Sequence, residues 1–395
     1  MDNTNDCVRT KAEIDDALLL AKLDKNELLP SSQMVYFAST NVFSKNYKLL
    51  QLDNHLLSTL EKGESLYIRG QDDDNAVLCT DMCTYNLLET ETSNSLLAVK
   101  DLNFFEGACD KLGCSSIKVD VFSIFNDYLE PVLSMPRLSK IREVLNKTIY
   151  RGPELECDVN ECDLCSFDDL LQKAQTSELE LRNILNAMPV VTINGKIRLL
   201  EQEYHFRVLS YMLKLIEENS WLLDEIVYED TIDSLSDIVP KEILTSLFEK
   251  YTVESKVIDG VQLYKYKEEE VCRFFAQILL LHAGKFNLNE FLQAWQESVP
   301  EGMIPKEEML YGISVINKKS NPPSIRAFAE EDLPENIHER FKILFDVKEK
   351  WTVPEITPYV RSLTSPKLDV TALLAKYARV STVNGTKYYS AKHAK

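Results

Sequence analysis

Four turn signals recur along this chain at a nearly constant spacing. Asn194-Gly195, Asp259-Gly260, the stretch 318–323 and Asn384-Gly385 each separate two short runs that are rich in β-branched and aromatic residues. Asn-Gly or Asp-Gly between two strand-like runs predicts a hairpin, because a type I′ turn needs a positive φ at both central residues and these residue types tolerate it. The turns lie about 61 to 65 residues apart, which is the mark of a structural repeat. The sequence therefore predicts four hairpins, one in each repeated unit.

Helices are predicted before each hairpin. Ser177 and Glu180 have the spacing of a capping box at a helix start. Pro240, Pro305 and Pro366 stand where the later short helices are expected to open, since proline is favoured at a first helical position. Longer leading helices are expected at Glu201–Glu218, Glu268–His282 and Asn336–Lys348. Second helices with capping-box patterns are expected to start at Ser166, Asn287 and Thr352. Three helices followed by a hairpin predict winged-helix units, a version of the helix-turn-helix.

The first hundred residues follow another pattern. An amphipathic helix is expected over 11–29, followed by short strand-like runs at 34–37, 47–52, 65–69, 76–79, 84–88 and 95–99. Such runs predict a small antiparallel sheet or barrel. Its core looks thin, so its edges are expected to pair with a partner. The candidate partner-binding residues are Leu66, Tyr67, Ile68, Val77, Leu78, Leu96 and Leu97.

These patterns predict an α+β chain in which a small N-terminal antiparallel β-barrel-type region, completed by partner subunits, precedes three to four tandem winged helices. The predicted segments are a β-rich partner-binding region with its N-terminal helix, a helix with an acidic linker, two winged helices, a winged-helix-like unit and a basic C-terminal winged helix. Their boundaries are 1–125, 126–165, 166–220, 221–284, 285–335 and 336–395.

Charge is distributed unevenly along the chain. The net charge is −19, yet residues 336–395 hold eleven Lys and Arg against five Asp and Glu, which leaves −25 for residues 1–335. A basic end on an acidic body favours one local contact with an anionic partner, although ordinary variation on a solvated face would also produce it. The helices before the first three hairpins are mixed or acidic and are expected to dock proteins. The DNA-binding candidates are Lys367, Lys376, Arg379, Lys387 and Lys392.

Recognised catalytic motifs are missing from the sequence. Neither a phosphate-binding glycine loop nor an HExxH pattern occurs, and the five histidines are scattered without a catalytic partner at a known spacing. Cys157, Cys162 and Cys165 have part of the spacing of plant-type iron–sulfur sites. Carboxylates surround them, and Cys109 and Cys114 could complete a site only if the sheet folded back, so exposed linker thiols are the favoured interpretation. The sequence thus predicts no catalytic, cofactor or metal site.

The sequence shows no recognisable targeting or membrane segment. The N-terminus has no basic and apolar signal pattern, and the longest apolar run is shorter than the roughly 20 residues of a membrane helix. An odd number of cysteines, nine, fits reduced thiols. A soluble cytosolic or nuclear protein without membrane contact is expected.

Several blocks resemble a known family. The segments Lys285–Phe291 and Trp295–Met303 closely resemble a signature of the sister chromatid cohesion family called "defective in sister chromatid cohesion". Further blocks at 332–335, 338–341 and 349–352 look like a second signature, and 21–30, 65–70 and 76–79 match the family's N-terminal region. The resemblance covers nearly the whole chain but is poor over residues 100–165.

The resemblance implies a non-ATPase subunit of the alternative replication factor C clamp loader. It implies a shared β-barrel with the small subunit and the tail of the large ATPase subunit, and winged helices, three in the family's usual description, that dock on DNA polymerase epsilon and bind single- and double-stranded DNA. The expected role is a nuclear adaptor at replication forks that supports loading or unloading of the sliding clamp PCNA, DNA replication and cohesion. Little sequence specificity is expected, because no side-chain set suits bidentate base contacts. A tandem winged-helix transcription regulator and a protein-complex scaffold are the alternatives.

Overall fold

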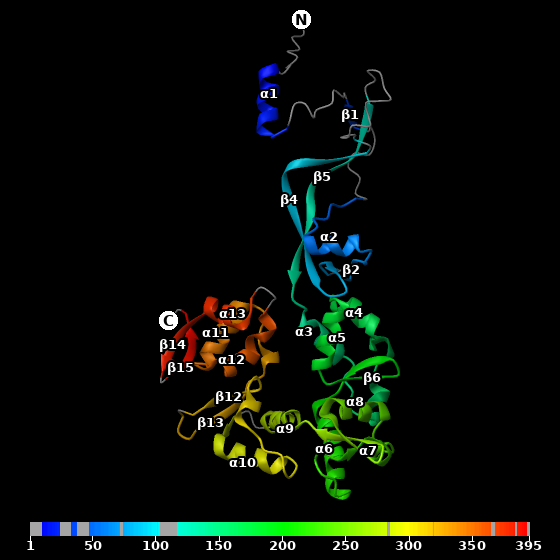
Figure 1. Ribbon diagram of the computed structural model, residues 1–395. Coiled ribbons are helices and arrows are strands. Elements are labelled where there is room, and N and C mark those ends of the chain that lie inside the picture. Colours follow the sequence, from blue (N-terminus) through cyan, green and yellow to red (C-terminus); the bar gives the residue numbers. More distant parts are fainter. Residues whose placement is uncertain are drawn as a thin grey trace. The chain divides into compact units, whose positions relative to one another are not determined.

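The structure is a computed structural model of the 395-residue chain, which divides into two compact units, Met1–Ser134 and Met135–Lys395 (Figure 1). It describes residues 10–23, 33–37, 47–71, 74–100, 102, 117–282, 285–318, 320–364, 368–383 and 385–392. Helices and small sheets alternate in both units, so the predicted α+β class is confirmed. No helix among these residues is long and apolar enough to cross a membrane.

The first unit is built on a five-stranded sheet with the strand order β1-β5-β4-β3-β2. Its elements are α1 (Lys11–Leu20), β1 (Gln33–Phe37), α2 (Asn54–Glu61), β2 (Tyr67–Arg69), β3 (Val77–Cys79), β4 (Thr84–Val99) and β5 (Ile117–Ser134). Neighbouring strands pair antiparallel, except that β1 runs parallel to β5. Figure 1 shows β4 and β5 as a long twisted ribbon, with α2 and β2 beside its lower part.

Several predictions for this unit were wrong. The runs 84–88 and 95–99 belong to one strand, β4, and the equally long β5 was not predicted. The middle of β4 is largely exposed, so its polar residues need not interrupt the strand, although they looked like a turn. The run 47–52 makes only an isolated bridge between Leu50 and Leu129. As far as the described residues show, the sheet is open and mixed, not a closed antiparallel barrel.

The core of the first unit is small. Leu56 of α2, Leu78 of β3 and Tyr85 of β4 form its buried cluster, with a few partly buried side chains around them. Three other buried apolar side chains lie along β5: Val119, Val121 and Phe125. Much of the apolar surface of this unit therefore stays in contact with solvent in the isolated chain.

The second unit repeats one order of elements four times: three helical segments and then a hairpin. The first set is α3 (Leu138–Asn146), α4 (Phe167–Ala174), α5 (Glu178–Ala187), β6 (Val190–Ile193) and β7 (Lys196–Leu199). The second is α6 (Gln202–Glu218), α7 (Tyr228–Leu235), α8 (Lys241–Tyr251), β9 (Thr252–Ile258) and β10 (Val261–Tyr266).

The other two sets complete the chain. The third is α9 (Glu268–His282), α10 (Leu288–Ser298), the short 3-10 helix Glu307–Leu310, β12 (Ser314–Asn317) and β13 (Ser324–Ala327). The fourth is α11 (Ile337–Val347), α12 (Val353–Val360), α13 (Val370–Tyr377), β14 (Ala378–Val383) and β15 (Thr386–Ala391). All four predicted hairpins are thus confirmed.

A further pairing is common to the four sets. The residues just before the second helix pair antiparallel with the second strand of the hairpin. Two of these pairings are short strands, β8 (Ile226–Val227) with β10 and β11 (Lys285–Asn287) with β13. The other two are single bridges, Cys165 with Ile197 and Trp351 with Tyr389. Each hairpin is therefore tied to the entrance of its own second helix.

Helix starts follow the predicted caps with several corrections. Pro240 is the N-cap of α8 and not its first residue, the short helix expected at Pro305 starts at Glu307, and Asn287 caps α10 without a capping box. Ser166, Ser177 and Thr352 form capping boxes as predicted. The last short helix, α13, does not open at Pro366, which lies outside the described residues; it starts at Val370, and the Asp369 carboxylate caps it by accepting from the Ala372 N–H at 2.7 Å. A carboxylate beside free N–H groups is a strong cap because it also meets the positive end of the helix dipole.

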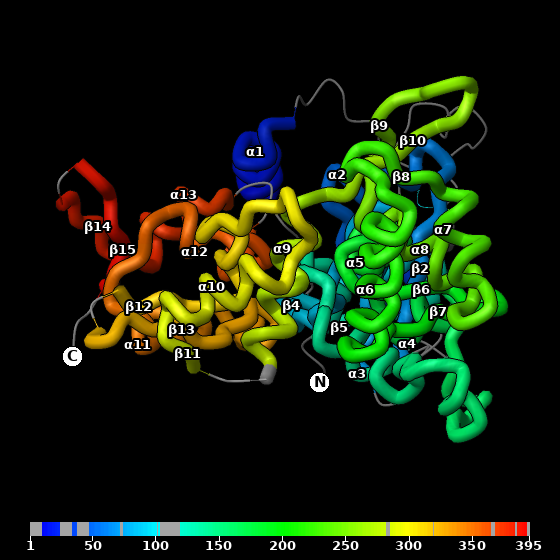
Figure 2. The backbone as a smooth tube through the Cα atoms, turned by 90° about the horizontal axis from the view of Figure 1, so that it is seen from below, coloured from blue at the N-terminus to red at the C-terminus, as the bar shows by residue number. Residues whose placement is uncertain are grey.

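Three buried cores hold the four sets. One lies within the first set, a large one joins the second and third sets and includes Val191 of β6, and a third fills the fourth set and includes Val315 of β12. The acidic stretch 152–165 carries two 3-10 turns, Pro153–Asp158 and Glu161–Asp163, and packs onto the first set: the buried guanidinium of Arg198 donates twice to the Glu156 carboxylate, each time at 2.8 Å. Figure 2 shows the β9–β10 and β14–β15 hairpins extending away from their helices.

Candidate interaction surfaces

The cysteines are candidates for a chemical role in the structure. Within the described part of the chain, no three His, Cys, Asp or Glu side chains converge to hold a metal ion. Cys157 and Cys162 are exposed, whereas the Cys165 thiol is buried and donates to the Asp163 carbonyl at 3.4 Å. Cys109 and Cys114 lie outside the described residues.

His205 is a core residue. Its Nε2 lies 3.0 Å from the Tyr251 hydroxyl, and its ring packs on Phe274 with a centroid distance of 4.2 Å. Burial, with the Lys250 ammonium as a smaller contribution, lowers the pKa of His205 to about 3. A histidine with so low a pKa stays neutral near pH 7, and the partner of its Nε2 is a buried phenol, so His205 has the environment of a core residue.

The predicted partner-binding residues of the first unit divide into two groups. Val77 and Leu78 of β3 are buried and form part of the core, and Leu66 packs partly against it. The exposed group contains Tyr67 and Ile68 on β2 and Leu96 and Leu97 on β4, with Ile68 67% exposed. Because β2 is at one edge of the sheet, its outer backbone groups are available for strand pairing.

The predicted DNA-binding residues gather on the last hairpin and its helix. Lys376 ends α13, Arg379 lies on β14, Lys387 on β15 and Lys392 just after it, and all four are exposed. Lys367 lies outside the described residues. The Lys392 ammonium donates to the Lys376 carbonyl at 2.9 Å, which ties the residue after β15 to the end of α13. In the described structure none of the four has a salt bridge to a carboxylate, so their charge is free for an external anion.

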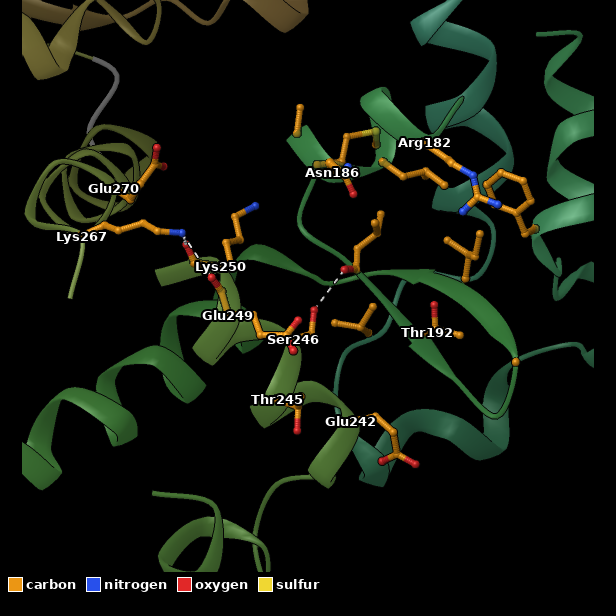
Figure 3. A pocket seen from close by; sticks show the side chains of 18 of the residues that line it. Arg182, Asn186, Thr192, Glu242, Thr245, Ser246, Glu249, Lys250, Lys267 and Glu270 are labelled. Carbon is orange, nitrogen blue, oxygen red and sulfur yellow. Dashed lines mark hydrogen bonds between the residues drawn. The ribbon is translucent and has the colours of Figure 1, made fainter. Parts of the chain in front are cut away.

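A groove that sequence reasoning missed lies beside α5, α8 and α9, with a volume of about 1620 Å³ (Figure 3). Cations and carboxylates from separate sets line it: Arg182, Lys241, Lys250, Lys267, Arg273, Arg361, Glu242, Glu249 and Glu270. Two of the cations donate hydrogen bonds to backbone carbonyls: Lys267 to that of Lys250 at 2.6 Å and Arg273 to that of Tyr311 at 2.7 Å. No local sequence signal brings these residues together, because they come from different helices.

Lys250 is the unusual cation of this groove. Its ammonium is directed into the open space, and burial lowers its pKa, while Glu270 partly opposes this effect (Figure 3). A partly desolvated ammonium without a hydrogen-bonded carboxylate gains more from an anion than a fully hydrated lysine does. The groove can therefore hold polar or anionic groups of a macromolecule.

These surfaces define the class of the protein: a modular α+β chain whose distinctive features are an exposed sheet edge and repeated helix–hairpin sets with charged surfaces. The family model described as "Sister chromatid cohesion protein Dcc1" matches residues 47–360, and the chain belongs to this family.

Individual relatives match over nearly their full length. The chain is 34% identical over 393 residues to the sister chromatid cohesion protein DCC1 of Homo sapiens, covering 97% of this chain and 98% of that protein. The DCC1 protein of Xenopus tropicalis is 34% identical over 388 residues, with 97% and 98% coverage. The Saccharomyces cerevisiae DCC1 protein is 22% identical over 365 residues, covering 85% of this chain and 94% of that protein. The family resemblance noted from the sequence is thereby confirmed.

Proposed function

We propose that this chain is a non-catalytic adaptor in sister chromatid cohesion. It joins the large ATPase subunit and the small subunit of an alternative clamp loader to DNA polymerase epsilon and to DNA, and so supports loading or unloading of PCNA at replication forks in the nucleus. Membership in a family named for cohesion supports the biological role. The exposed apolar sheet of the first unit is the structural observation that carries the adaptor role.

Strand pairing is the proposed mode of assembly for the first unit. Tyr67, Ile68, Leu96 and Leu97 expose large apolar side chains on a unit whose central cluster has only three buried members. A partner that added strands to the β2 edge would bury Tyr67 and Ile68 and pair the free backbone groups of that edge. Leu96 and Leu97 lie farther along β4, where it pairs with β5 and not with β3, and offer a second apolar contact. The barrel would then be completed by chains other than this one.

Winged helices are the proposed identity of the four sets in the second unit. Each set has three helical segments, a hairpin and a pairing that ties the hairpin to the second helix. In the winged-helix form of the helix-turn-helix, the helix before the hairpin faces DNA. Among the described residues, only the fourth set has a net positive charge on this helix, through Lys376, together with exposed cations without salt bridges on both hairpin strands. The fourth set is therefore the proposed DNA contact, and the first three sets are proposed to dock proteins.

A pull-down from nuclear extract tests the assembly. The double variant Ile68→Asp with Leu97→Asp should lose the clamp-loader subunits that wild type captures, identified by mass spectrometry. The matched control Val257→Asp with Ile304→Asp changes two exposed apolar residues of the second unit and should keep them. If both variants retain the same clamp-loader subunits, the first unit is not their docking surface.

DNA binding is tested by charge reversal in the full chain. Lys376→Glu, Arg379→Glu and Lys387→Glu together should weaken binding to any duplex, and should flatten the decrease of affinity with salt, because fewer counterions are released. The control Lys62→Glu, Lys265→Glu and Lys306→Glu has the same charge change at exposed sites elsewhere. A strong preference of wild type for one DNA sequence would favour a transcription regulator instead.

A further inference from the structure

A second groove in the second unit has an apolar floor and an acidic rim. It has a volume of about 820 Å³ and is formed by α6, α9 and the segment that follows α10. Its floor is aliphatic and aromatic: Phe206, Leu213, Ile216, Trp221, Phe275 and Val299. Phe206 and Phe275 meet edge to face with a centroid distance of 5.3 Å, which fixes the floor from two helices. This volume and lining are typical of sites that accept a few apolar side chains.

Trp221 is the aromatic residue that can respond to a ligand here. It is only partly buried and lies directly after the end of α6, whereas Trp295 and Trp351 are buried in the cores with 0% and 2% exposure. No hydrogen bond of the Trp221 indole is recorded in the described structure, although a half-buried tryptophan usually finds a partner for its N–H. The floor therefore offers an apolar surface with one free donor.

The rim of this groove is negative. Glu217, Glu297 and Glu301 are exposed and form no salt bridge among the described residues, and Lys214 is the one cation that lines the groove. The Asp224 carboxylate, also on the rim, is already engaged by the Lys256 ammonium at 3.3 Å. Uncompensated carboxylates on both walls would attract cationic side chains of a ligand.

Helix dipoles add to this field. α6 ends at Glu218 and α10 at Ser298, and neither helix has a basic residue in its last turn. Helix C-termini carry partial negative charge and are normally stabilised by Lys, Arg or His nearby. Two such ends, bearing Glu217 and Glu297 in place of cations, therefore converge on one apolar groove.

We propose that this groove docks a basic amphipathic segment of a protein partner, with apolar side chains on the floor and Lys or Arg side chains at the rim. Nucleic acid does not fit, because its phosphates would meet carboxylates. A second copy of this chain, with a net charge of −19, is also a poor match. The site rests on the proposed function, in which the second and third sets dock proteins, and adds the chemistry of the segment that they bind.

Binding of a synthetic peptide to the full chain tests this site. The probe carries leucine at helical positions i, i+3, i+4 and i+7 and lysine at the others, with a fluorescent label for anisotropy. It should bind saturably and change the Trp221 emission. A second peptide with the same leucines and glutamate in place of lysine should not bind.

Two variants with equal charge change locate the binding. Glu217→Lys with Glu301→Lys should lower the affinity for the lysine peptide at least tenfold. Glu218→Lys with Glu308→Lys, at exposed positions outside the groove, should change this affinity by no more than about twofold. Trp221→Ala should also weaken anisotropy-detected binding, and circular dichroism checks its fold.

Three outcomes would overturn the site. Equal loss in both charge variants would mean nonspecific attraction to an acidic protein, and equal binding of the glutamate peptide would mean apolar contact alone. Sedimentation that changes with protein concentration in wild type, but not in Trp221→Ala, would assign the groove to a second copy.

Discussion

The guanidinium of Arg340 and the carboxylate of Glu330 meet at 2.7 Å inside the fourth set, with 5% and 24% of their side chains exposed. Arg340 also donates to the carbonyls of Pro334, Leu333 and Tyr359 and to the Ser362 hydroxyl. One side chain thus satisfies the backbone just before α11 and at the end of α12. A planar guanidinium with five N–H donors can do this, and a lysine cannot.

Replacement of Arg340 by alanine should lower the free energy of unfolding of the fourth set by about 3–5 kcal/mol, because three carbonyls and Glu330 lose their partner in the interior. Urea unfolding followed by Trp351 emission measures this, since Trp351 lies in the same core. Arg361→Ala, at an exposed position, serves as the control and should change stability by less than about 0.5 kcal/mol. Equal midpoints for the two variants would contradict the structural role of Arg340.

The acidic stretch should behave as part of the first set and not as a linker. Glu156→Gln removes the charge that pairs with the buried Arg198, so we expect a loss of about 1.5–3 kcal/mol in the free energy of unfolding. Glu154→Gln is the matched control, because Glu154 lies 3.6 Å from Arg207 with both side chains well exposed, and such pairs contribute about 1 kcal/mol or less. Limited proteolysis within 152–165 should accelerate only in the Glu156 variant.

The hairpins could be predicted because each has a local signal in the sequence. The turns at Asn194 and Asp259 have positive φ in the structure, so the chemistry of these residues determined the hairpins regardless of the rest of the chain. The long strand β4 was missed because its exposed polar middle has no alternation to detect, and its partner β5 lies far along the chain. The two grooves could not be predicted either, since each combines side chains from helices that come together only in the tertiary fold.

Acid should destabilise the large core through His205. The folded pKa is about 3 against an unfolded value near 6.5, so below pH 6.5 the unfolded chain binds a proton that the folded chain does not. The free energy of unfolding should therefore fall as pH decreases from 6.5 toward 3, by about 2 kcal/mol at pH 5. Burial is the main cause, and Lys250 is the nearby charge that adds to it.

Urea unfolding at pH 7 and pH 5, followed by the emission of Trp295 in the same core, measures this effect. His205→Gln should be less stable at pH 7 but should lose less stability between the two pH values than wild type. His338→Gln, at an exposed histidine, should keep the wild-type dependence. If the dependence survives in His205→Gln, another group titrates.

The first unit should depend on its partners for folding. Expressed alone, residues 1–134 should be aggregated or should unfold without a cooperative transition, because Leu56, Leu78 and Tyr85 form a small central cluster while Ile68 is 67% exposed. Residues 135–395, which contain the three larger cores, should give a monodisperse fragment with a cooperative urea transition. Size-exclusion chromatography and urea unfolding of both fragments provide the comparison. A monodisperse, cooperatively unfolding 1–134 fragment would contradict the strand-pairing mode of assembly, since its sheet would then be complete without added strands.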